Sequence, residues 1–255
     1  MTDIKRRLLL KVGGLSILGS LLPPVGYLTS ACAQTGILNS INSPAKRWGM
    51  AVDLSKCPAG CRDCIDACHN LHNVPTMEKP GDEIHWIQKV PFPAAFPSQE
   101  NPYAEKPQRD REVIIMCNHC SNPPCVRVCP TKATFKRSDG IVMMDYHRCI
   151  GCRFCIAACP YGARSMNFRN PRPFLQSINP AYPTRTHGVV EKCNFCEERL
   201  AKNLPPACVA ACRYKALFFG DMAQPKSDIR ILISGRQAIR RRPELGTDPH
   251  IFYIG

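Results

Sequence analysis

The stretch CIGCRFCIAACP, residues 149–160, decides the fold, because it spaces four cysteines as C-x2-C-x2-C-x3-C and ends on proline. Bacterial ferredoxins hold iron–sulfur clusters with this pattern. Three cysteines at three-residue steps can cap three corners of one cubane. The fourth, Cys159, is expected to start a helix, to point away and to ligate another cluster. Pro160 then fixes φ and removes a backbone donor directly after that ligand.

Sixteen of the 17 cysteines fall into four such groups, and the odd one is Cys32 near the N-terminus. The groups are Cys57, Cys61, Cys64 and Cys68; Cys117, Cys120, Cys125 and Cys129; Cys149, Cys152, Cys155 and Cys159; and Cys193, Cys196, Cys208 and Cys212. The first group has one extra residue in its first gap, and the fourth stretches one gap to eleven residues. Four repeats of one motif predict two duplicated bacterial-ferredoxin-like modules that hold four [4Fe–4S] clusters.

Disulfides and structural zinc are the alternatives for a protein with so many cysteines. The run C-x2-C-x2-C leaves too little Cα separation for efficient disulfide pairing. Zinc uses four ligands and has no need of the longer motif with its terminal proline. Iron–sulfur clusters are therefore the favoured interpretation.

The formal charge of +14 would ordinarily indicate nucleic acid or an anionic surface as the partner. Four oxidised [4Fe–4S] clusters, each held by four thiolates, would add roughly eight negative charges. The balance falls to about +6, which a solvated surface of mixed charge explains. No nucleic-acid partner is expected.

The N-terminus reads as a targeting segment. Lys5, Arg6 and Arg7 precede a mildly apolar stretch that carries no charge between Lys11 and Lys46. This pattern is similar to a twin-arginine signal, which exports folded proteins and so suits a protein that collects its metal first. Residues 1–33 are predicted to be a cleaved twin-arginine-type signal peptide or a retained anchor, followed by a linker over 34–47. Export would place the protein on the extracytoplasmic face of the cytoplasmic membrane.

The remainder, residues 48–255, is expected to be one loop-rich α+β domain. Short apolar runs precede each group and predict strands, and Asp139-Gly140 predicts a hairpin with a two-residue turn. Two proline-rich inserts, about 91–107 and 171–183, are too polar for core elements and are expected to be surface loops or partner-wrapping arms. The predicted parts are an outer module of 48–90 plus 188–222, an inner module of 111–170 and a C-terminal tail of 223–255.

No motif for another cofactor or for catalysis stands out. The sequence lacks C-x-x-C-H, G-x-G-x-x-G and a phosphate loop, so covalent haem and nucleotide binding are not predicted. Four histidines flank cysteines and are interpreted as packing or hydrogen-bonding residues: His69, His72, His119 and His147. No catalytic site of the protein's own is expected.

The sequence resembles the four-cluster iron–sulfur subunits of membrane-associated oxidoreductases. The stretches that carry the resemblance are CNHCSNPPCVRVCPTKAT (117–134), DYHRCIGCRFCIAACPYGAR (145–164), KCNFCEERLAKNLPPACVAAC (192–212) and ELGTDPHIFYI (244–254). Within that family, the leader together with RWGMAVDLSKC (47–57) and ACHNLHNVP (67–75) is similar to the exported iron–sulfur subunits of Dsr-type complexes of sulfur metabolism, the DsrO type.

The resemblance implies that the groups exchange their fourth ligands. Cluster 1 would use Cys57, Cys61, Cys64 and Cys212; cluster 2 Cys117, Cys120, Cys125 and Cys159; cluster 3 Cys149, Cys152, Cys155 and Cys129; and cluster 4 Cys193, Cys196, Cys208 and Cys68.

It also implies an electron-transfer subunit that works between an integral, menaquinone-reactive membrane subunit and a multihaem cytochrome c, with further subunits in one complex. The alternative is the electron-transfer subunit of a molybdopterin enzyme of the polysulfide or dimethyl sulfoxide reductase type. A disulfide- or zinc-stapled binding module with no redox role is the third hypothesis, and an iron-free preparation would favour it.

Overall fold

The computed structural model describes residues 45–99 and 101–255. The predicted signal or anchor over 1–33, and the predicted linker up to residue 44, lie outside the described residues. In the described part of the protein, no helix combines the length and the apolar character needed to cross a membrane.

Strands and helices are short and alternate along the described residues. The strands are β1 Trp48–Asp53, β2 Ile87–Pro91, β3 Glu112–Met116, β4 Thr134–Lys136, β5 Val142–Met144, β6 Ser165–Met166, β7 Val190–Glu191, β8 Leu217–Asp221, β9 Ala238–Ile239 and β10 Ile251–Ile254. The α-helices are α3 Asp63–His72, α4 Phe92–Ala95, α5 Lys106–Arg109, α6 Pro124–Arg127, α7 Phe154–Ala157, α8 Glu197–Leu200, α9 Ala207–Ala210 and α10 Asp228–Ser234. The 3-10 helices are η1 Pro80–Asp82, η2 Pro97–Gln99, η3 Arg172–Phe174 and η4 Pro243–Leu245. This mixed composition agrees with the predicted loop-rich α+β class.

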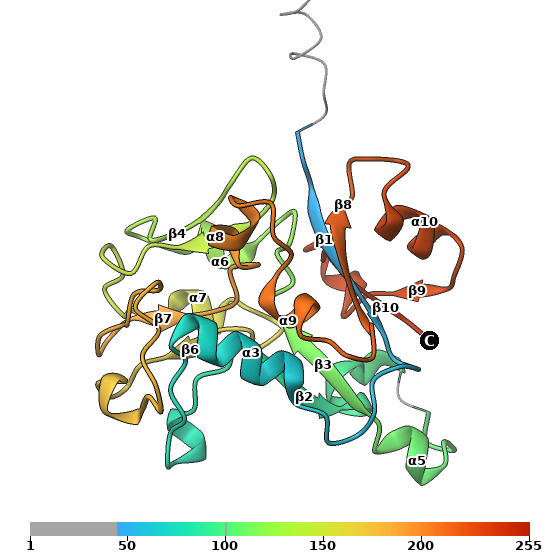
Figure 1. Cartoon of the computed structure of the whole chain (residues 1–255), viewed down its shortest axis with the longest axis horizontal. Helices are drawn as coiled ribbons and strands as arrows, with labels where there is room; N and C mark the ends of the chain where they lie inside the picture. The colour runs from blue at the N-terminus through green and yellow to red at the C-terminus, as the bar shows by residue number, and fades with distance from the viewer. Residues whose placement is uncertain (1–44, 100) are drawn as a thin grey trace, which may run out of the picture. The chain divides into compact units, whose positions relative to one another are not determined.

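The largest sheet joins the two ends of the described region. Its strand order is β8-β1-β10-β9, with β1 parallel to β10 and antiparallel to β8 (Figure 1). β1 lies inside this sheet, between β8 and β10, and a strand in such a position is buried and therefore apolar. Accordingly, Met50 and Val52 of β1 are buried in the main core. Val52 pairs with Leu217, so the end of β1 lies beside the start of β8. Cys57 follows β1 and Cys212 precedes β8, so the pairing of these strands places the two cysteines at the same end of the sheet.

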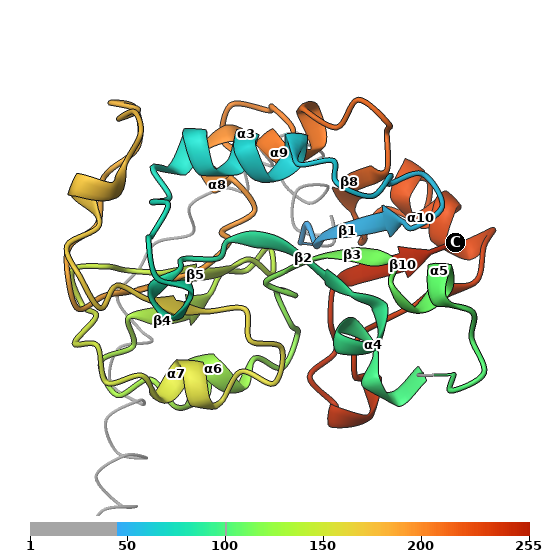
Figure 2. The ribbon, with the colours of Figure 1, turned by 90° about the horizontal axis from the view of Figure 1, so that it is seen from below.

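Three two-stranded ribbons complete the pairing within the described residues: β2–β3, β4–β5 and β6–β7. The apolar runs predicted as strands before Cys57, Cys117 and Cys149 are β1, β3 and β5, and the run after Cys212 is β8. The run over 188–190 is a strand only from Val190 onward. In Figure 2, α6 and α7 lie next to each other beneath the β4–β5 ribbon, and α3 lies beside α9; both helix pairs are in contact.

The β4–β5 hairpin forms as predicted, but its turn has three residues rather than two. The backbone N–H of Arg137 donates to the carbonyl of Ile141 at 2.9 Å, which encloses residues 138–140. Gly140 ends the turn at φ +85°, a left-handed conformation that glycine adopts without strain. The prediction was wrong because Gly140 occupies the left-handed position of a three-residue loop and not the second position of a two-residue turn.

The position of the fourth cysteine relative to its helix also differs from the expectation. α7 contains Cys155 and ends at Ala157, so Cys159 follows this helix instead of starting one. α6 and α9 likewise contain the third cysteine of their groups and end before the fourth. Pro160 disfavours helical φ and ψ at the residue before it, which is consistent with the early end of α7.

The first proline-rich insert contributes to the core, contrary to the prediction that it would be a surface loop. Ala95 is fully buried and Phe96 is 1% exposed. The ring of Phe96 meets that of Tyr253 edge to face, with 5.0 Å between centroids. The prolines of this insert break it into short helical turns, but they leave two apolar residues free to pack beneath β10.

Candidate iron–sulfur sites

The sixteen grouped cysteines are free thiols in the described residues, and half of them are buried. A tetrahedral zinc site would bring four sulfurs within about 3.8 Å of one another, since zinc–sulfur bonds are about 2.3 Å long. Among the described residues, three or more candidate ligand atoms lie within 4.8 Å of one another only at His72, Cys196 and Glu198. The cysteine groups are therefore spaced too widely for single zinc ions and suit a larger metal centre.

Cys57, Cys61 and Cys64 lie near Cys212. Burial raises the pKa of Cys64 to about 12, and negative charge on Cys57, Cys212 and Cys61 adds to the rise. Burial likewise raises the pKa of Cys57, while the ammonium group of Lys89 opposes the rise. The backbone N–H of Ala216 donates to Cys212 Sγ at 3.2 Å. A thiolate at this position would gain from that donor.

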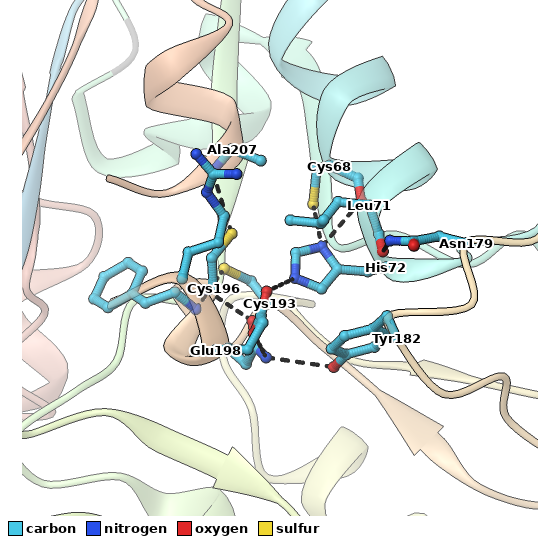
Figure 3. Close-up of polar contacts among 12 residues, drawn as sticks. Cys68, Leu71, His72, Asn179, Tyr182, Cys193, Cys196, Glu198 and Ala207 are labelled. Carbon is cyan, nitrogen blue, oxygen red and sulfur yellow. Dashed lines mark hydrogen bonds and ion pairs between the residues drawn. The ribbon is translucent and has the colours of Figure 1, made fainter. Parts of the chain in front are cut away.

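Cys68 lies near the last group, although it belongs to the first group in sequence. Burial raises its pKa well above the usual value, and the charges of Cys193, Cys208 and Cys196 add to the rise. Figure 3 shows Cys68 on α3 facing the loop that carries Cys193 and Cys196. The N–H of Phe195 donates to Cys193 Sγ at 3.4 Å.

Cys159 lies near the second group. Burial raises the pKa of Cys120 to about 12, together with the charges of Cys117, Cys125 and Cys159, while a hydrogen bond from Thr247 opposes the rise. Cys125, Cys117 and Cys159 also act on Arg164, whose Nη2 donates to Cys125 Sγ at 3.0 Å.

Cys129 lies near the third group. Burial raises the pKa of Cys155, Arg164 opposes the rise, and Cys149 and Cys129 add to it. Cys152 stands three residues before Cys155 in the same loop. The pKa of Cys129 is lowered: burial would raise it, but hydrogen bonds from the neighbouring loop and from the start of β4 outweigh burial. These donors stabilise a thiolate, which is the form that binds metal.

We number these sets of thiols like the clusters that the resemblance implies: set 1 is Cys57, Cys61, Cys64 and Cys212; set 2 is Cys117, Cys120, Cys125 and Cys159; set 3 is Cys149, Cys152, Cys155 and Cys129; and set 4 is Cys193, Cys196, Cys208 and Cys68. The four sets adjoin one another in a definite order. Cys64 acts electrostatically on Cys68 and on Cys208, so set 1 adjoins set 4. Cys117 acts on Cys193, so set 4 adjoins set 2. Arg164 lies between Cys125 and Cys155, which joins set 2 to set 3. The order 1-4-2-3 does not follow the sequence, and sequence reasoning did not find it.

Of the four histidines that flank cysteines, His72 and His119 make the expected hydrogen bonds and packing contacts, whereas the buried Nε2 of His69 has no hydrogen-bond partner among the described residues. His72 Nδ1 lies 3.0 Å from the Cys68 carbonyl and 3.6 Å from Cys68 Sγ, and Nε2 lies 2.9 Å from Glu198 Oε1. Figure 3 shows His72 between Cys68 and Glu198. His119 is fully buried, accepts from the Val142 backbone N–H and stacks on Phe195 with 3.7 Å between ring centroids. Sequence reasoning missed Glu198, because its contact with His72 spans 126 positions.

Comparison with protein families supports the cluster chemistry. Two family models, both described as a 4Fe-4S dicluster domain, match residues 113–171 and 148–216. Two dicluster domains and sixteen cysteines fit four [4Fe–4S] clusters.

Curated proteins extend the similarity over the whole sequence. The protein is 38% identical over 274 residues to "Hdr-like menaquinol oxidoreductase iron-sulfur subunit 1" of Archaeoglobus fulgidus, covering 98% of this sequence and 97% of the relative. It is 33% identical to "Menaquinone reductase, iron-sulfur cluster-binding subunit" of Nitratidesulfovibrio vulgaris, covering 82% and 88%. It is 36% identical to the B subunit of polysulfide reductase of Wolinella succinogenes, covering 82% and 95%.

Proposed function

This protein belongs to the family of [4Fe–4S] iron–sulfur electron-transfer subunits of menaquinol, polysulfide and dimethyl sulfoxide oxidoreductases, and we propose that it works in a Dsr-type complex of sulfur metabolism. In this proposal it is the exported DsrO-type subunit. It carries electrons between an integral, quinone-reactive membrane subunit and a multihaem cytochrome c.

The continuous order of the four cysteine sets carries the proposal. Sets 1 and 4 and sets 4 and 2 adjoin through their thiols, and sets 2 and 3 adjoin through Arg164, so electrons that enter at one end could leave at the other without a mobile carrier. The clusters would supply one-electron transfer when bound. The protein's own residues supply the thiols, donate backbone hydrogen bonds to the sulfurs of Cys193 and Cys212, and shield the buried thiols from water.

The proposed ligand sets follow the same geometry. Cluster 1 takes Cys57, Cys61, Cys64 and Cys212; cluster 2 takes Cys117, Cys120, Cys125 and Cys159; cluster 3 takes Cys149, Cys152, Cys155 and Cys129; and cluster 4 takes Cys193, Cys196, Cys208 and Cys68. Because sets 1 and 3 lie at the ends of the row, they are the sets through which the two partners would exchange electrons with the protein.

The Dsr-type assignment has support from the relative in Archaeoglobus fulgidus. Its name refers to a menaquinol oxidoreductase, and the match spans nearly the whole of both proteins. The paired arginines near the N-terminus support export by the twin-arginine route to the extracytoplasmic face of the cytoplasmic membrane. The proposed function needs this location, because multihaem c-type cytochromes are placed there in the proposed complex.

A second candidate is the electron-transfer subunit of a molybdopterin oxidoreductase. The similarity to the polysulfide reductase B subunit, of which 95% is covered, favours this candidate. Both candidate functions use the same four clusters. They differ in the partner protein that exchanges electrons with these clusters.

Purification of the native complex from membranes tests the proposal. We expect about sixteen irons per copy of the protein, a matching content of acid-labile sulfide and covalently bound haem c with no molybdenum. Molybdenum without haem c would replace the Dsr-type assignment with the second candidate. An iron-free protein would overturn both.

A further inference from the structure

Two buried cations lie between cysteine sets and have no carboxylate partner. Arg164 is 5% exposed and Lys192 is 1% exposed. No carboxylate of the described residues lies within 4.0 Å of either side chain, whereas the buried Arg185 is paired with Glu191 at 2.7 Å. Arg164 instead donates to Cys125 Sγ at 3.0 Å and to Thr134 Oγ1 at 2.8 Å. Lys192 donates to the carbonyls of Val142 and Cys193.

A buried cation without a counter-charge is costly, so these two residues indicate an anion nearby. Burial alone would lower the pKa of Arg164, but the charges of Cys125, Cys117, Cys155 and Cys159 outweigh it and raise that pKa. Burial lowers the pKa of Lys192, and Cys117 is the largest opposing influence. Three of the four thiols that act on Arg164 belong to set 2, and set 2 also supplies the main counter-charge of Lys192.

The other sets have different surroundings. Glu198 places a negative charge beside Cys193 and Cys196, and its Oε2 accepts from Asn194 Nδ2 at 3.2 Å. Set 4 therefore has a carboxylate on one side and Lys192 on the other. Lys89 faces Cys57 of set 1, but its Nζ lies 3.2 Å from Glu112. Set 3 shares Arg164 with set 2 through Cys155. Set 2 is thus the one that both unpaired cations face.

We infer that Arg164 and Lys192 give cluster 2 the highest reduction potential of the four clusters, so that it is reduced first. The inference rests on the proposed ligand sets. Reduction adds one electron to the cluster, makes or breaks no bond to the protein and moves no proton. Fixed positive charge in a low-dielectric surrounding stabilises the added negative charge and so raises the potential. Arg164 and Lys192 hold fixed positive charges near cluster 2 and do not themselves react.

A redox titration followed by EPR tests this inference on the full-length, cluster-loaded protein. In Arg164→Gln, the first signal to appear on reduction is expected to shift to lower potential. Arg164→Lys, which keeps the charge, should leave the midpoint of that signal close to the wild-type value. Lys89→Gln is the matched control, because it removes a cation beside set 1, and it should leave the first signal in place. An unshifted first signal in Arg164→Gln at full iron content would overturn the inference.

A ligand substitution identifies the first-reduced cluster in protein that keeps both cations. Cys120→Ser should change the line shape or the midpoint of the first signal, and Cys61→Ser should not. The opposite result would overturn the inference even if Arg164→Gln does not fold. If wild-type protein holds about sixteen irons but a cluster other than cluster 2 is reduced first, the inference is overturned and the proposed function is unaffected. If wild-type protein holds no iron, the proposed function itself is overturned.

Discussion

Arg185 and Glu191 form an ion pair in the core, with 2.7 Å between Nη2 and Oε2 and with both side chains shielded from solvent. Trp86 Nε1 also donates to Glu191 Oε2, at 2.8 Å. Arg185 donates to the carbonyls of His72 and Asn73, which are the last residue and the C-cap of α3. The pair therefore ties β7 to the helix that supplies Cys68.

We predict that Arg185→Met destabilises the protein strongly. The substitution removes the partner of a buried carboxylate and also frees two carbonyls, so Glu191 would remain charged and unpaired. The expected loss in the free energy of unfolding is about 3–5 kcal/mol. The thermal midpoint and the half-life of the visible cluster absorbance would both fall.

An exposed ion pair provides the matched control. Arg169 lies 3.0 Å from Asp82, and its side chain is 45% exposed. Arg169→Met makes the same chemical change at the surface and is expected to cost less than about 1 kcal/mol. Equal losses in the two variants would show that the buried pair has no special role in stability.

His250 is expected to make stability depend on pH. Its Nε2 lies 3.0 Å from Arg47 Nε and 2.9 Å from Ser121 Oγ. Burial lowers the pKa of His250 to about 4, the charge of Arg47 lowers it further, and Asp248 opposes the change. The unfolded protein, with a pKa near 6.5, therefore takes up the proton first as the pH falls. This contribution is fully present above about pH 6.5 and is lost toward pH 4.

The size of the effect is about 2 kcal/mol between about pH 7.5 and pH 5. Thermal midpoints of wild type and His250→Asn measured across this range would test it. The variant should be less stable at the upper pH but should show a smaller decline on acidification. His187→Asn, at an exposed position, is the control and should decline as the wild type does. A wild-type slope retained in His250→Asn would contradict the assignment to this histidine.

Local sequence signals predicted the strands well and the long-range geometry poorly. The apolar runs that became β1 and β3 could be identified because each is a short buried segment directly before a cysteine group. The burial of Phe96 could not, because the surrounding prolines indicate a loop and its partner Tyr253 lies near the other end of the sequence. β10 enters the main sheet between β1 and β9 for the same long-range reason.

The cysteines themselves were predictable, but the residues that tune them were not. Each thiol belongs to a spaced motif that can be read within twenty residues. Arg164 lies 39 positions from Cys125, and Glu198 lies 126 positions from His72. Charge–thiol contacts of this kind depend on tertiary packing, which leaves no spacing rule in the sequence.

Gly151 is predicted to tolerate no side chain. It has φ +66°, and a Cβ there would lie 2.4 Å from the carbonyl oxygen of Gly188. Gly151→Ala must therefore displace the backbone inside the third cysteine motif, and we expect a loss of about 3 kcal/mol or more. Thermal unfolding and iron content per protein would measure it.

Gly162→Ala separates conformational strain from this clash. Gly162 has nearly the same φ, +61°, but nothing lies within 4 Å of a Cβ at that position. Only the left-handed backbone penalises the substitution, by about 1 kcal/mol. If the two alanine variants lost the same stability and iron, contact with the Gly188 carbonyl would not be the cause.

The exchange of fourth ligands predicts which cysteine variants resemble one another. Cys129→Ser and Cys149→Ser should perturb the same EPR signal, because both thiols act on Cys155. Cys125→Ser should perturb a different signal, although Cys125 is only four residues from Cys129.

The comparison is internally controlled, since all three variants replace one thiol by one hydroxyl in the inner region of the sequence. Iron content should fall from about sixteen toward twelve per protein wherever a cluster is lost outright. Pairing of Cys129→Ser with Cys125→Ser instead would mean that each sequence group holds its own cluster. The proposed ligand sets and the order of the clusters would then be wrong, and Arg164 would lie between different clusters from those proposed.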